Sequence, residues 1–157
     1  MSFFALPTSL IDSPALSGTD AMPRAALVVY RQLMGQPYFL LISARRDINR
    51  LTLPGGKVDK DEPALQSAIR ETVEEAGVMT DRHQPLGLYE HEKTSGKIYP
   101  TQTFLARYVG YESGHEKREL YWLTVAELRD PNWSIREAII EQVERAAEAL
   151  LAYTAAS

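Results

Sequence analysis

Three glutamates, Glu71, Glu74 and Glu75, lie within one short stretch of the sequence and could hold a cation. At about 100° per residue, their side chains would share one side of a helix. Hard divalent cations such as Mg²⁺ and Mn²⁺ take oxygen ligands from one or two carboxylates and leave other positions to water and phosphate. The same side chains could instead form a solvated acidic face screened by Arg70. The spacing alone leaves both interpretations open.

A helix over residues 62–76 is expected to carry these glutamates. Asp61 is a candidate N-cap, Pro63 suits the first turn, and Gly77 suits the position just after the helix. The opposite side of the helix is largely apolar and carries Leu65, Ala68, Ile69, Thr72, Val73 and Ala76. We therefore expect the helix to pack through its apolar face and to present the glutamates to a ligand.

Apolar runs separated by turn residues predict strands on both sides of this helix. Their expected ranges are residues 25–33, 38–43, 51–53, 85–91, 98–109 and 120–124. The glycines of the turn Pro54-Gly55-Gly56 would let the backbone approach a ligand closely. One helical turn is expected over residues 125–128, and the capping box Ser134-x-x-Glu137 is expected to open a final helix. These elements alone indicate an α+β fold.

The composition suits one globular domain: the chain has 157 residues, of which 45% are hydrophobic and 24% charged. Residues 1–22 are expected to form an irregular arm, and residues 23–157 the domain. The net charge of −4 argues against general nucleic-acid binding. No uncharged run approaches the length of a membrane span. The absence of cysteine is compatible with the cytoplasm, where we expect the protein to be located.

Residues 56–78 match every fixed position of the Nudix box, G-x5-E-x7-R-E-U-x-E-E-x-G-U. The matching residues are Gly56, Glu62, Arg70, Glu71, Glu74, Glu75 and Gly77. Val78 fits the final aliphatic position, whereas Thr72 stands where an aliphatic residue is usual. The chain therefore resembles the Nudix hydrolase family. The resemblance implies an α/β/α sandwich around a mixed sheet, with a Nudix helix and a C-terminal helix.

The Nudix resemblance also implies a role for several residues of this stretch. Glu71 and Glu75 would bind Mg²⁺ or Mn²⁺ together with the backbone carbonyl of Gly55. Glu74 would act as the general base on a water molecule, and Arg70 would orient a glutamate. The reaction implied is hydrolysis of a phosphoric anhydride, in which the cations neutralise phosphate charge.

Other glutamates have roles that the sequence leaves open. Glu119 precedes a Trp-containing strand, as in many Nudix enzymes, and would be a further metal ligand or base; the alternative is an ion pair with its basic neighbours. Glu62 would either support the site or favour the helix start electrostatically. Glu90 and Glu92 are weaker candidates of the same kind as Glu119.

Substrate binding is expected to depend on basic residues near the glycine turn. Several segments are similar to the diphosphoinositol polyphosphate phosphohydrolase branch, which also takes diadenosine polyphosphates. The expected substrate-binding residues are Arg24, Arg46, Arg50, Gly56, Lys57, Lys93 and Lys117. The chain departs from that branch at Lys57, where a third glycine is usual, and at residues 93–97, which are less basic. A solvated loop is the alternative for the arginines at positions 45, 46 and 50.

Three functions follow from these observations. The first is a metal-dependent pyrophosphohydrolase acting on a nucleoside diphosphate derivative or a polyphosphorylated small molecule. The second is a Nudix-fold module that senses such a ligand without cleaving it, which the complete set of glutamates disfavours. The third is a scaffold in which the final helix and the arm mediate assembly, for example as a homodimer.

Overall fold

The computed structural model describes residues 23–93, 95–113, 116 and 118–156. The expected arm, residues 1–22, lies outside these described residues. Within the described part of the chain, neither helix combines the length and the apolar character needed to cross a bilayer.

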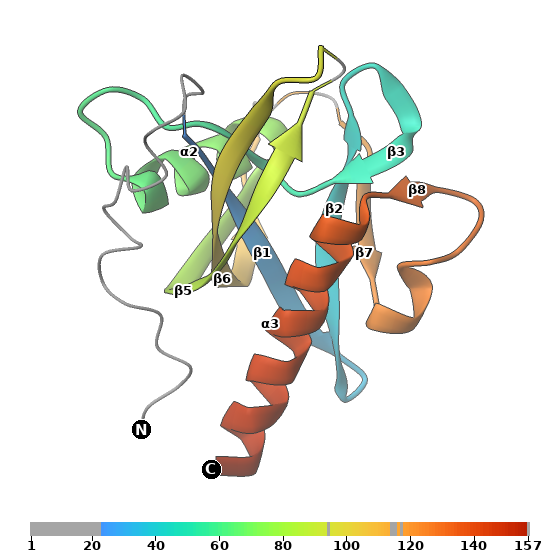
Figure 1. The fold of residues 1–157 in the computed structure, drawn as a ribbon. Coiled ribbons are helices and arrows are strands. Elements are labelled where there is room, and N and C mark those ends of the chain that lie inside the picture. Colours follow the sequence, from blue (N-terminus) through green and yellow to red (C-terminus); the bar gives the residue numbers. More distant parts are fainter. Residues whose placement is uncertain (1–22, 94, 114–115, 117, 157) are drawn as a thin grey trace.

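One mixed sheet of eight strands forms the centre of the molecule (Figure 1). The strands are β1 (Arg24–Leu33), β2 (Gln36–Ala44), β3 (Asp47–Thr52), β4 (Gly55–Lys57), β5 (Val78–Glu92), β6 (Ile98–Tyr111), β7 (Leu120–Leu123) and β8 (Ser134–Ile135). Their order is β5-β6-β1-β2-β3-β8, with β4 paired to β1 and β7 paired to β2. The β1–β6 and β3–β8 pairs are parallel, and the other pairs are antiparallel.

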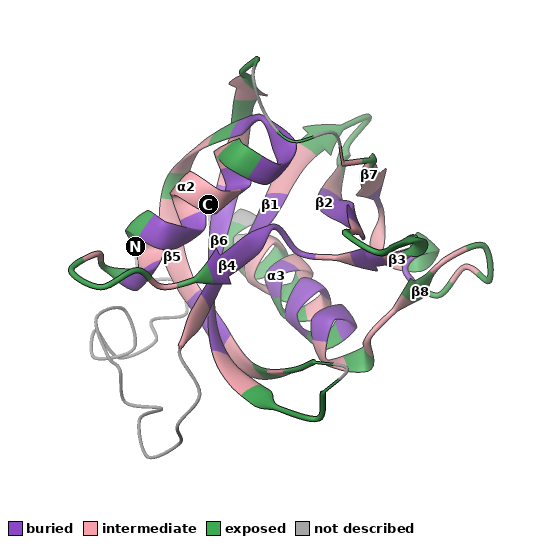
Figure 2. Cartoon of the chain, turned by 90° about the horizontal axis from the view of Figure 1, so that it is seen from above, coloured by how far each residue is buried: buried purple, intermediate pink, exposed green. Residues whose placement is uncertain are grey.

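Two helices, α2 (Ala64–Ala76) and α3 (Glu137–Ala156), cover opposite faces of this sheet (Figure 2). Strand β1 is buried on both sides because successive side chains point to opposite faces. Ala26 and Val28 pack in the apolar cluster on the α3 side, and Leu27 and Val29 in the cluster on the α2 side. Each fully buried large aliphatic side chain contributes about 1.5–3 kcal/mol to folding. The α/β/α sandwich expected from the sequence is confirmed.

A pair of buried hydrogen bonds fixes α3 against the sheet. The hydroxyl of Thr103 on β6 donates to Gln142 Oε1 at 2.6 Å, and Gln142 Nε2 donates to the Leu88 carbonyl on β5 at 3.1 Å. Gln142 is 5% exposed, so these polar atoms are satisfied by the protein. The second turn of α3 is thereby held against the middle of the β5–β6 hairpin, where Leu88 pairs with Gln102.

The start of each helix differs from the sequence-based expectation. Helix α2 begins at Ala64, with Pro63 at the N-cap position, and no side chain caps it. Asp61 has a φ of 69°, which is the left-handed region, so it was wrongly predicted as the N-cap. Ser134 belongs to β8 and pairs with Arg50, so the helix opens at Glu137 and the predicted capping box is wrong.

Two strands are longer than their apolar patterns indicate. Strand β3 begins at Asp47, whereas the strand expected here begins at residue 51, so Arg50 lies in a strand and not in a solvated loop. Strand β5 begins at Val78 instead of residue 85 and is interrupted by register shifts after Met79, Asp81 and Pro85. Such shifts break the regular alternation of apolar and polar residues, which is why periodicity missed the first half of β5. The short turn η1 (Val125–Glu127) lies where one helical turn was expected.

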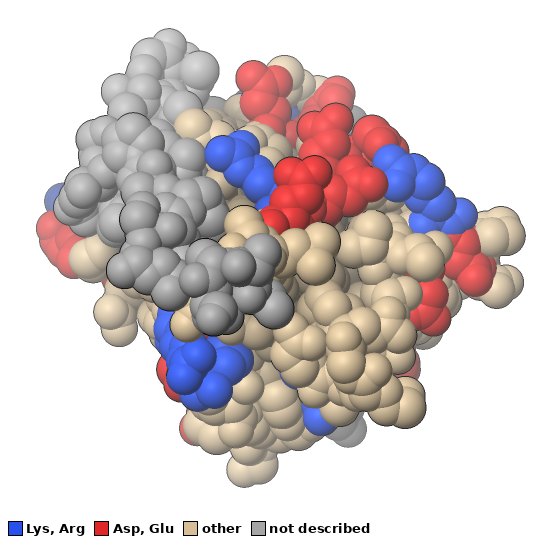
Figure 3. All heavy atoms as spheres, turned by 90° about the horizontal axis from the view of Figure 1, so that it is seen from below, with Lys and Arg blue, Asp and Glu red and all other residues tan. Residues whose placement is uncertain are grey.

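On the face that Figure 3 shows, the basic side chains do not form one continuous surface. Lys and Arg side chains occur there in separate small groups, and Asp and Glu side chains gather between two of them.

Candidate functional site

The glycine turn lies directly against α2. Strand β4 pairs with β1 in the register Ala26 to Gly55 and Ala25 to Gly56. A Cβ atom at Gly56 would lie 2.7 Å from Glu71 Cδ, and one at Gly55 would overlap the Ala25 backbone. Position 55 therefore requires glycine, whereas a side chain at position 56 would displace the Glu71 carboxylate, which is in close contact with the backbone of the turn.

Glu75 is the most buried acid of the site, with a side chain that is 8% exposed. Its Oε1 accepts a hydrogen bond from the Gly55 N–H at 2.8 Å, and its Oε2 accepts one from Arg118 Nη2 at 3.0 Å. Burial raises the pKa of Glu75 to about 7; the nearby charge of Glu71 adds to the increase, whereas the Gly55 N–H and Arg118 oppose it. The carboxylate is thus fixed beside the glycine turn.

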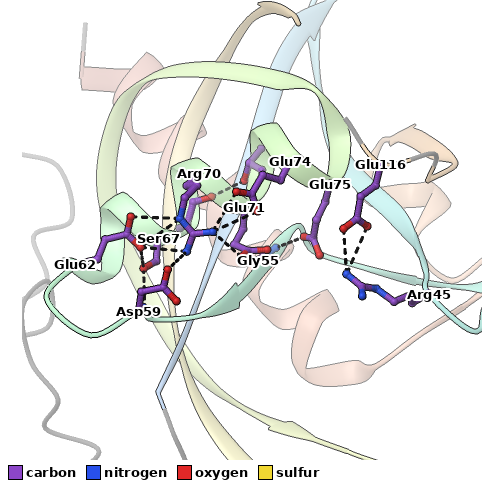
Figure 4. Close-up of polar contacts among 12 residues, drawn as sticks. Arg45, Gly55, Asp59, Glu62, Ser67, Arg70, Glu71, Glu74, Glu75 and Glu116 are labelled. Carbon is purple, nitrogen blue, oxygen red and sulfur yellow. Dashed lines mark hydrogen bonds and ion pairs between the residues drawn. The ribbon is translucent and has the colours of Figure 1, made fainter. Parts of the chain in front are cut away.

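Arg70 connects the other acids of the helix (Figure 4). Its Nη1 donates to Glu71 Oε1 at 2.9 Å and to Glu74 Oε1 at 3.3 Å. Its Nη2 donates to Glu62 Oε1 at 3.1 Å and to Asp59 Oδ2 at 3.0 Å. These hydrogen bonds raise the pKa of Arg70, so the guanidinium remains charged. Arg70 holds four carboxylates, two on α2 and two on the segment before it.

Glu62 supports Arg70 from outside the helix. Its Oε1 accepts a hydrogen bond from the Ser67 hydroxyl at 2.5 Å. The hydrogen bonds from Arg70 and Ser67 lower the pKa of Glu62. Because Glu62 precedes α2 and contacts the arginine that binds Glu71, the structure places it in a supporting position and not among the residues that line the turn.

The donor chemistry of this cluster fits a hard divalent cation, since Glu71, Glu75 and the Gly55 carbonyl all offer oxygen atoms at one turn. Among the described residues, however, no group of three or more acidic or His side chains is arranged to hold a metal ion. Glu71 and Glu74 face Arg70, and Glu75 faces Arg118. Burial raises the pKa of Glu71, as it does that of Glu75. Among the described residues, Arg70 donates to Glu71, and the Gly55 N–H and Arg118 donate to Glu75.

Arg118 is a site residue that sequence reasoning missed. Its side chain is 9% exposed, and its Nη1 donates to the Ser43 carbonyl at 3.0 Å in addition to the contact with Glu75. Next to it, the Glu119 N–H donates to Ser43 Oγ at 3.0 Å, so the main chain of Glu119 is fixed to β2. Lys117 lies outside the described residues. The only sequence signal for Arg118 was its place in a basic segment before a Trp-containing strand.

The predicted substrate-binding residues divide into three groups. Gly56, Lys57 and Arg24 lie together, because Lys57 is the partner of Arg24 across β4 and β1. Arg50 and Lys93 line a cavity of ≈ 510 Å³ on the other side of the β5–β6 hairpin tip. Arg46 is exposed in the turn between β2 and β3.

The neighbour of Arg46, Arg45, contacts Glu116, which is hydrogen-bonded to the acidic helix. Its Nη2 donates to Glu116 Oε1 at 3.1 Å. The Glu116 N–H in turn donates to the Glu74 carbonyl at 2.7 Å. The turn between β2 and β3, which holds Arg45 and Arg46, is thus linked to the end of α2 through Arg45 and not through the predicted Arg46.

Comparison with known proteins identifies the family. A family model described as the NUDIX domain matches residues 21–143. The chain is 36% identical over 109 residues to the asymmetrical bis(5'-nucleosyl)-tetraphosphatase of Caenorhabditis elegans, which covers 69% of this chain and 66% of that protein. It is 32% identical over 106 residues to Nudix hydrolase 4 of Arabidopsis thaliana, which covers 64% of this chain and 51% of that protein. The chain thus spans about two thirds and about half of the lengths of these two relatives.

A solved structure agrees with these sequence matches. The crystal structure of a C. elegans Ap4A hydrolase binary complex aligns with a TM-score of 0.59 and 25% identity, covering 87% of this chain and 100% of that one. The glycine turn and the whole of α2 lie within the residues that the family model matches. From the fold, the acidic helix and these matches together, we conclude that this chain belongs to the NUDIX family.

Proposed function

We propose that the chain is a divalent-cation-dependent pyrophosphohydrolase that cleaves a phosphoric anhydride bond in a nucleotide derivative or another polyphosphorylated small molecule. The observation that supports this most is the placement of two carboxylates from one helix, the partly buried Glu71 and the buried Glu75, against the Gly55–Gly56 backbone. Membership of the NUDIX family and similarity to the C. elegans tetraphosphatase support the reaction class.

The carboxylates at the glycine turn would hold the cation. A phosphoric anhydride resists hydrolysis because its charged oxygens repel an incoming nucleophile. Bound Mg²⁺ or Mn²⁺ would supply positive charge to those oxygens. Glu71 and Glu75 would be its ligands, and the carbonyl oxygen of Gly55 would be a further donor. Arg70 and Arg118 would orient the two carboxylates toward the turn and oppose the rise in their pKa values that burial causes.

Glu74 is the proposed general base. Its side chain is 52% exposed, so water can reach its oxygens. A general base must be held within hydrogen-bond reach of the water that it activates. Arg70 Nη1 is shared between Glu71 and Glu74, at 2.9 Å and 3.3 Å, and would keep the base next to the proposed cation ligand.

Bis(5'-nucleosyl) polyphosphates are the substrate class that we favour, by analogy with the C. elegans relative. Arg24 and Lys57 flank the glycine turn on adjacent strands and would bind phosphate oxygens beside the cleaved bond. We also expect the protein to be cytoplasmic.

The proposed function is tested by measuring product release from diadenosine tetraphosphate, ADP-ribose and ATP with Mg²⁺, with Mn²⁺ and with EDTA. We expect turnover that requires a divalent cation. Glu74→Gln and Glu75→Gln should each lower kcat by about 10²–10⁴-fold while the circular dichroism spectrum is retained. Glu141→Gln, an exposed position on α3, is the matched control.

Two outcomes would contradict this proposal. Full activity of either the Glu74 or the Glu75 variant would show that the acidic helix is not the catalytic site. Tight nucleotide binding by the wild-type protein without any turnover would favour the ligand-sensing module.

A further inference from the structure

The cavity of ≈ 510 Å³ lies where three elements meet, away from the acidic face of α2. Residues that line it come from β3, from the β5–β6 hairpin and from the start of α3; they include Arg50, Glu90, Glu92, Lys93, Arg136 and Ala138. Three of these six side chains are cationic and two are anionic. The site is thus built from parts of the chain that are far apart in sequence.

Arg136 has an unused hydrogen-bond donor at this cavity. Its Nη1 is buried and has no hydrogen-bond partner among the described residues. The backbone cannot move away easily, because the Arg136 carbonyl accepts hydrogen bonds from the Ile139 and Ile140 N–H groups at 2.9 Å and 3.1 Å. A buried donor without an acceptor is unfavourable, so such groups in native proteins call for an explanation. An anionic ligand in the cavity would supply the missing acceptor if the guanidinium turned toward it, because Nη1 is buried in the present orientation of the side chain.

The electrostatic environment of the cavity favours an anion. His91 lies on β5 between the cavity residues Glu90 and Glu92, and its pKa is lowered to about 4 by burial and by the positive charges of Arg24, Arg136, Lys93 and Arg50. Burial and the charge of Arg50 likewise lower the pKa of Arg136. Positive charges that lie close together repel one another. A phosphate would stabilise them, because it accepts several charge-assisted hydrogen bonds.

Arg24 connects this cavity with the acidic helix. Its charge lowers the pKa values of both Glu71 and His91, so it is close enough to act on both sites. The sheet register shows the same connection: Lys57 is opposite Arg24, Arg24 is opposite Thr101, and Thr101 is opposite Tyr89. This row crosses three strand pairs, or about 14 Å at ~4.8 Å per strand. The row ends at Tyr89, which is next to the cavity residue Glu90, so a substrate with several phosphates would follow it from the glycine turn toward the cavity.

We propose that the Arg136 cavity is a second anion site, which binds a phosphate group of the substrate distant from the bond that is cleaved. Arg136, Arg50 and Lys93 would donate to its oxygens, and Arg136 would determine specificity for substrates that carry phosphates beyond the cleaved pair. This inference rests on the proposed function for the identity of the substrate. Phosphate binding at the cavity is a separate property that does not depend on turnover.

Binding without catalysis tests the site directly. Inorganic triphosphate is titrated into the metal-free full-length protein with EDTA present, and the heat of binding is measured. We expect Arg136→Gln to weaken triphosphate binding by about tenfold, the loss of one charge-assisted contact. Arg145→Gln, exposed on the same helix, is the control and should bind like the wild type. Unchanged binding by the Arg136 variant, or equal weakening by both variants, would overturn the proposal.

Kinetics and stability separate a binding role from a structural one. We expect Arg136→Gln to raise KM for diadenosine tetraphosphate by about tenfold while kcat and the KM for ADP-ribose change less than about twofold. Because the substitution removes an unsatisfied buried donor, Tm should stay the same or rise. An equal loss with both substrates, or a marked fall in Tm, would assign Arg136 a structural role instead. If the wild type cleaves none of the substrates, the proposed function fails, whereas the triphosphate titration still decides the anion site.

Discussion

Arg118 and Arg136 are both withdrawn from solvent, yet their guanidinium groups differ in hydrogen bonding. Each nitrogen of Arg118 donates within the chain, to Glu75, to the Ser43 carbonyl and to Glu116. Arg136 Nη1 is buried and has no acceptor among the described residues. One arginine completes a network of its own chain, and the other faces a cavity.

This difference shows how the two ends of the proposed substrate site are built. A buried charge stabilises a fold only when its partners satisfy it, and removal of one partner leaves the other uncompensated. Around α2, acids and arginines satisfy one another before any ligand arrives. At the start of α3, three cationic and two anionic side chains line one cavity, and Arg136 Nη1 has no acceptor among the described residues. Substitutions in the first region should therefore affect stability, and substitutions in the second should affect ligand binding.

The largest effect on stability is expected from Arg118→Gln. It leaves the Glu75 carboxylate, 8% exposed, without its cationic partner. Breaking a buried pair in this way costs about 3–5 kcal/mol of the free energy of unfolding. Urea denaturation of the variant beside wild type and Arg145→Gln measures this loss. A change as small as that of the Arg145 variant would show that the buried pair does not hold the site together.

A smaller effect is expected from Gly56→Ala. The added Cβ would lie 2.7 Å from Glu71 Cδ, so the Glu71 carboxylate must move away from the turn and from its contact with Arg70. Overpacking of this kind costs about 1–3 kcal/mol. Gly110→Ala is the control, because the nearest atom there is the flexible end of Met79 at 3.3 Å. If chemical denaturation finds both variants equally stable, the turn is not packed against Glu71 as described.

The smallest effect is expected from Arg45→Gln, which removes an ion pair at the surface. The Arg45 side chain is 70% exposed, and Glu116 also accepts a hydrogen bond from Arg118. Exposed pairs contribute about 0–1 kcal/mol, and salt screens them. The difference in unfolding free energy from wild type should therefore be near zero in about 0.5 M salt, because the screening length falls from about 10 Å at 0.1 M salt to about 3 Å at 1 M. A loss as large as that of Arg118→Gln would mean that the outer pair, and not the buried one, stabilises this region.

The acidic helix could be predicted from sequence because its information is local. Three glutamates at helical spacing and a glycine at each end depend only on neighbours along the chain. Gly77 adopts a φ of 65° and its N–H donates to the Val73 carbonyl, as expected for the residue after a helix. The sandwich fold was likewise predictable, since the matched box carries the family resemblance.

Contacts between residues far apart in the sequence explain why the start of α3, the Arg118–Glu75 contact and the cavity could not be predicted. Ser134 has the signature of a helix cap, but pairing of β8 with β3 takes precedence over that local signal. The contact of Arg118 with Glu75 joins residues separated by 43 positions. The cavity combines Arg50, Lys93 and Arg136 from three elements, and no local spacing indicates that they meet. Periodicity describes one element at a time, so sites made by several elements appear only in the folded chain.

The most direct test of the central claim is a titration of Mn²⁺ into the wild-type protein and the Glu75→Gln variant, followed by electron paramagnetic resonance of the free ion. We predict that the wild type binds Mn²⁺ and that the variant binds it at least about tenfold more weakly. Equal binding by the two proteins, or no binding by the wild type, would contradict the assignment of the acidic helix as the cation site.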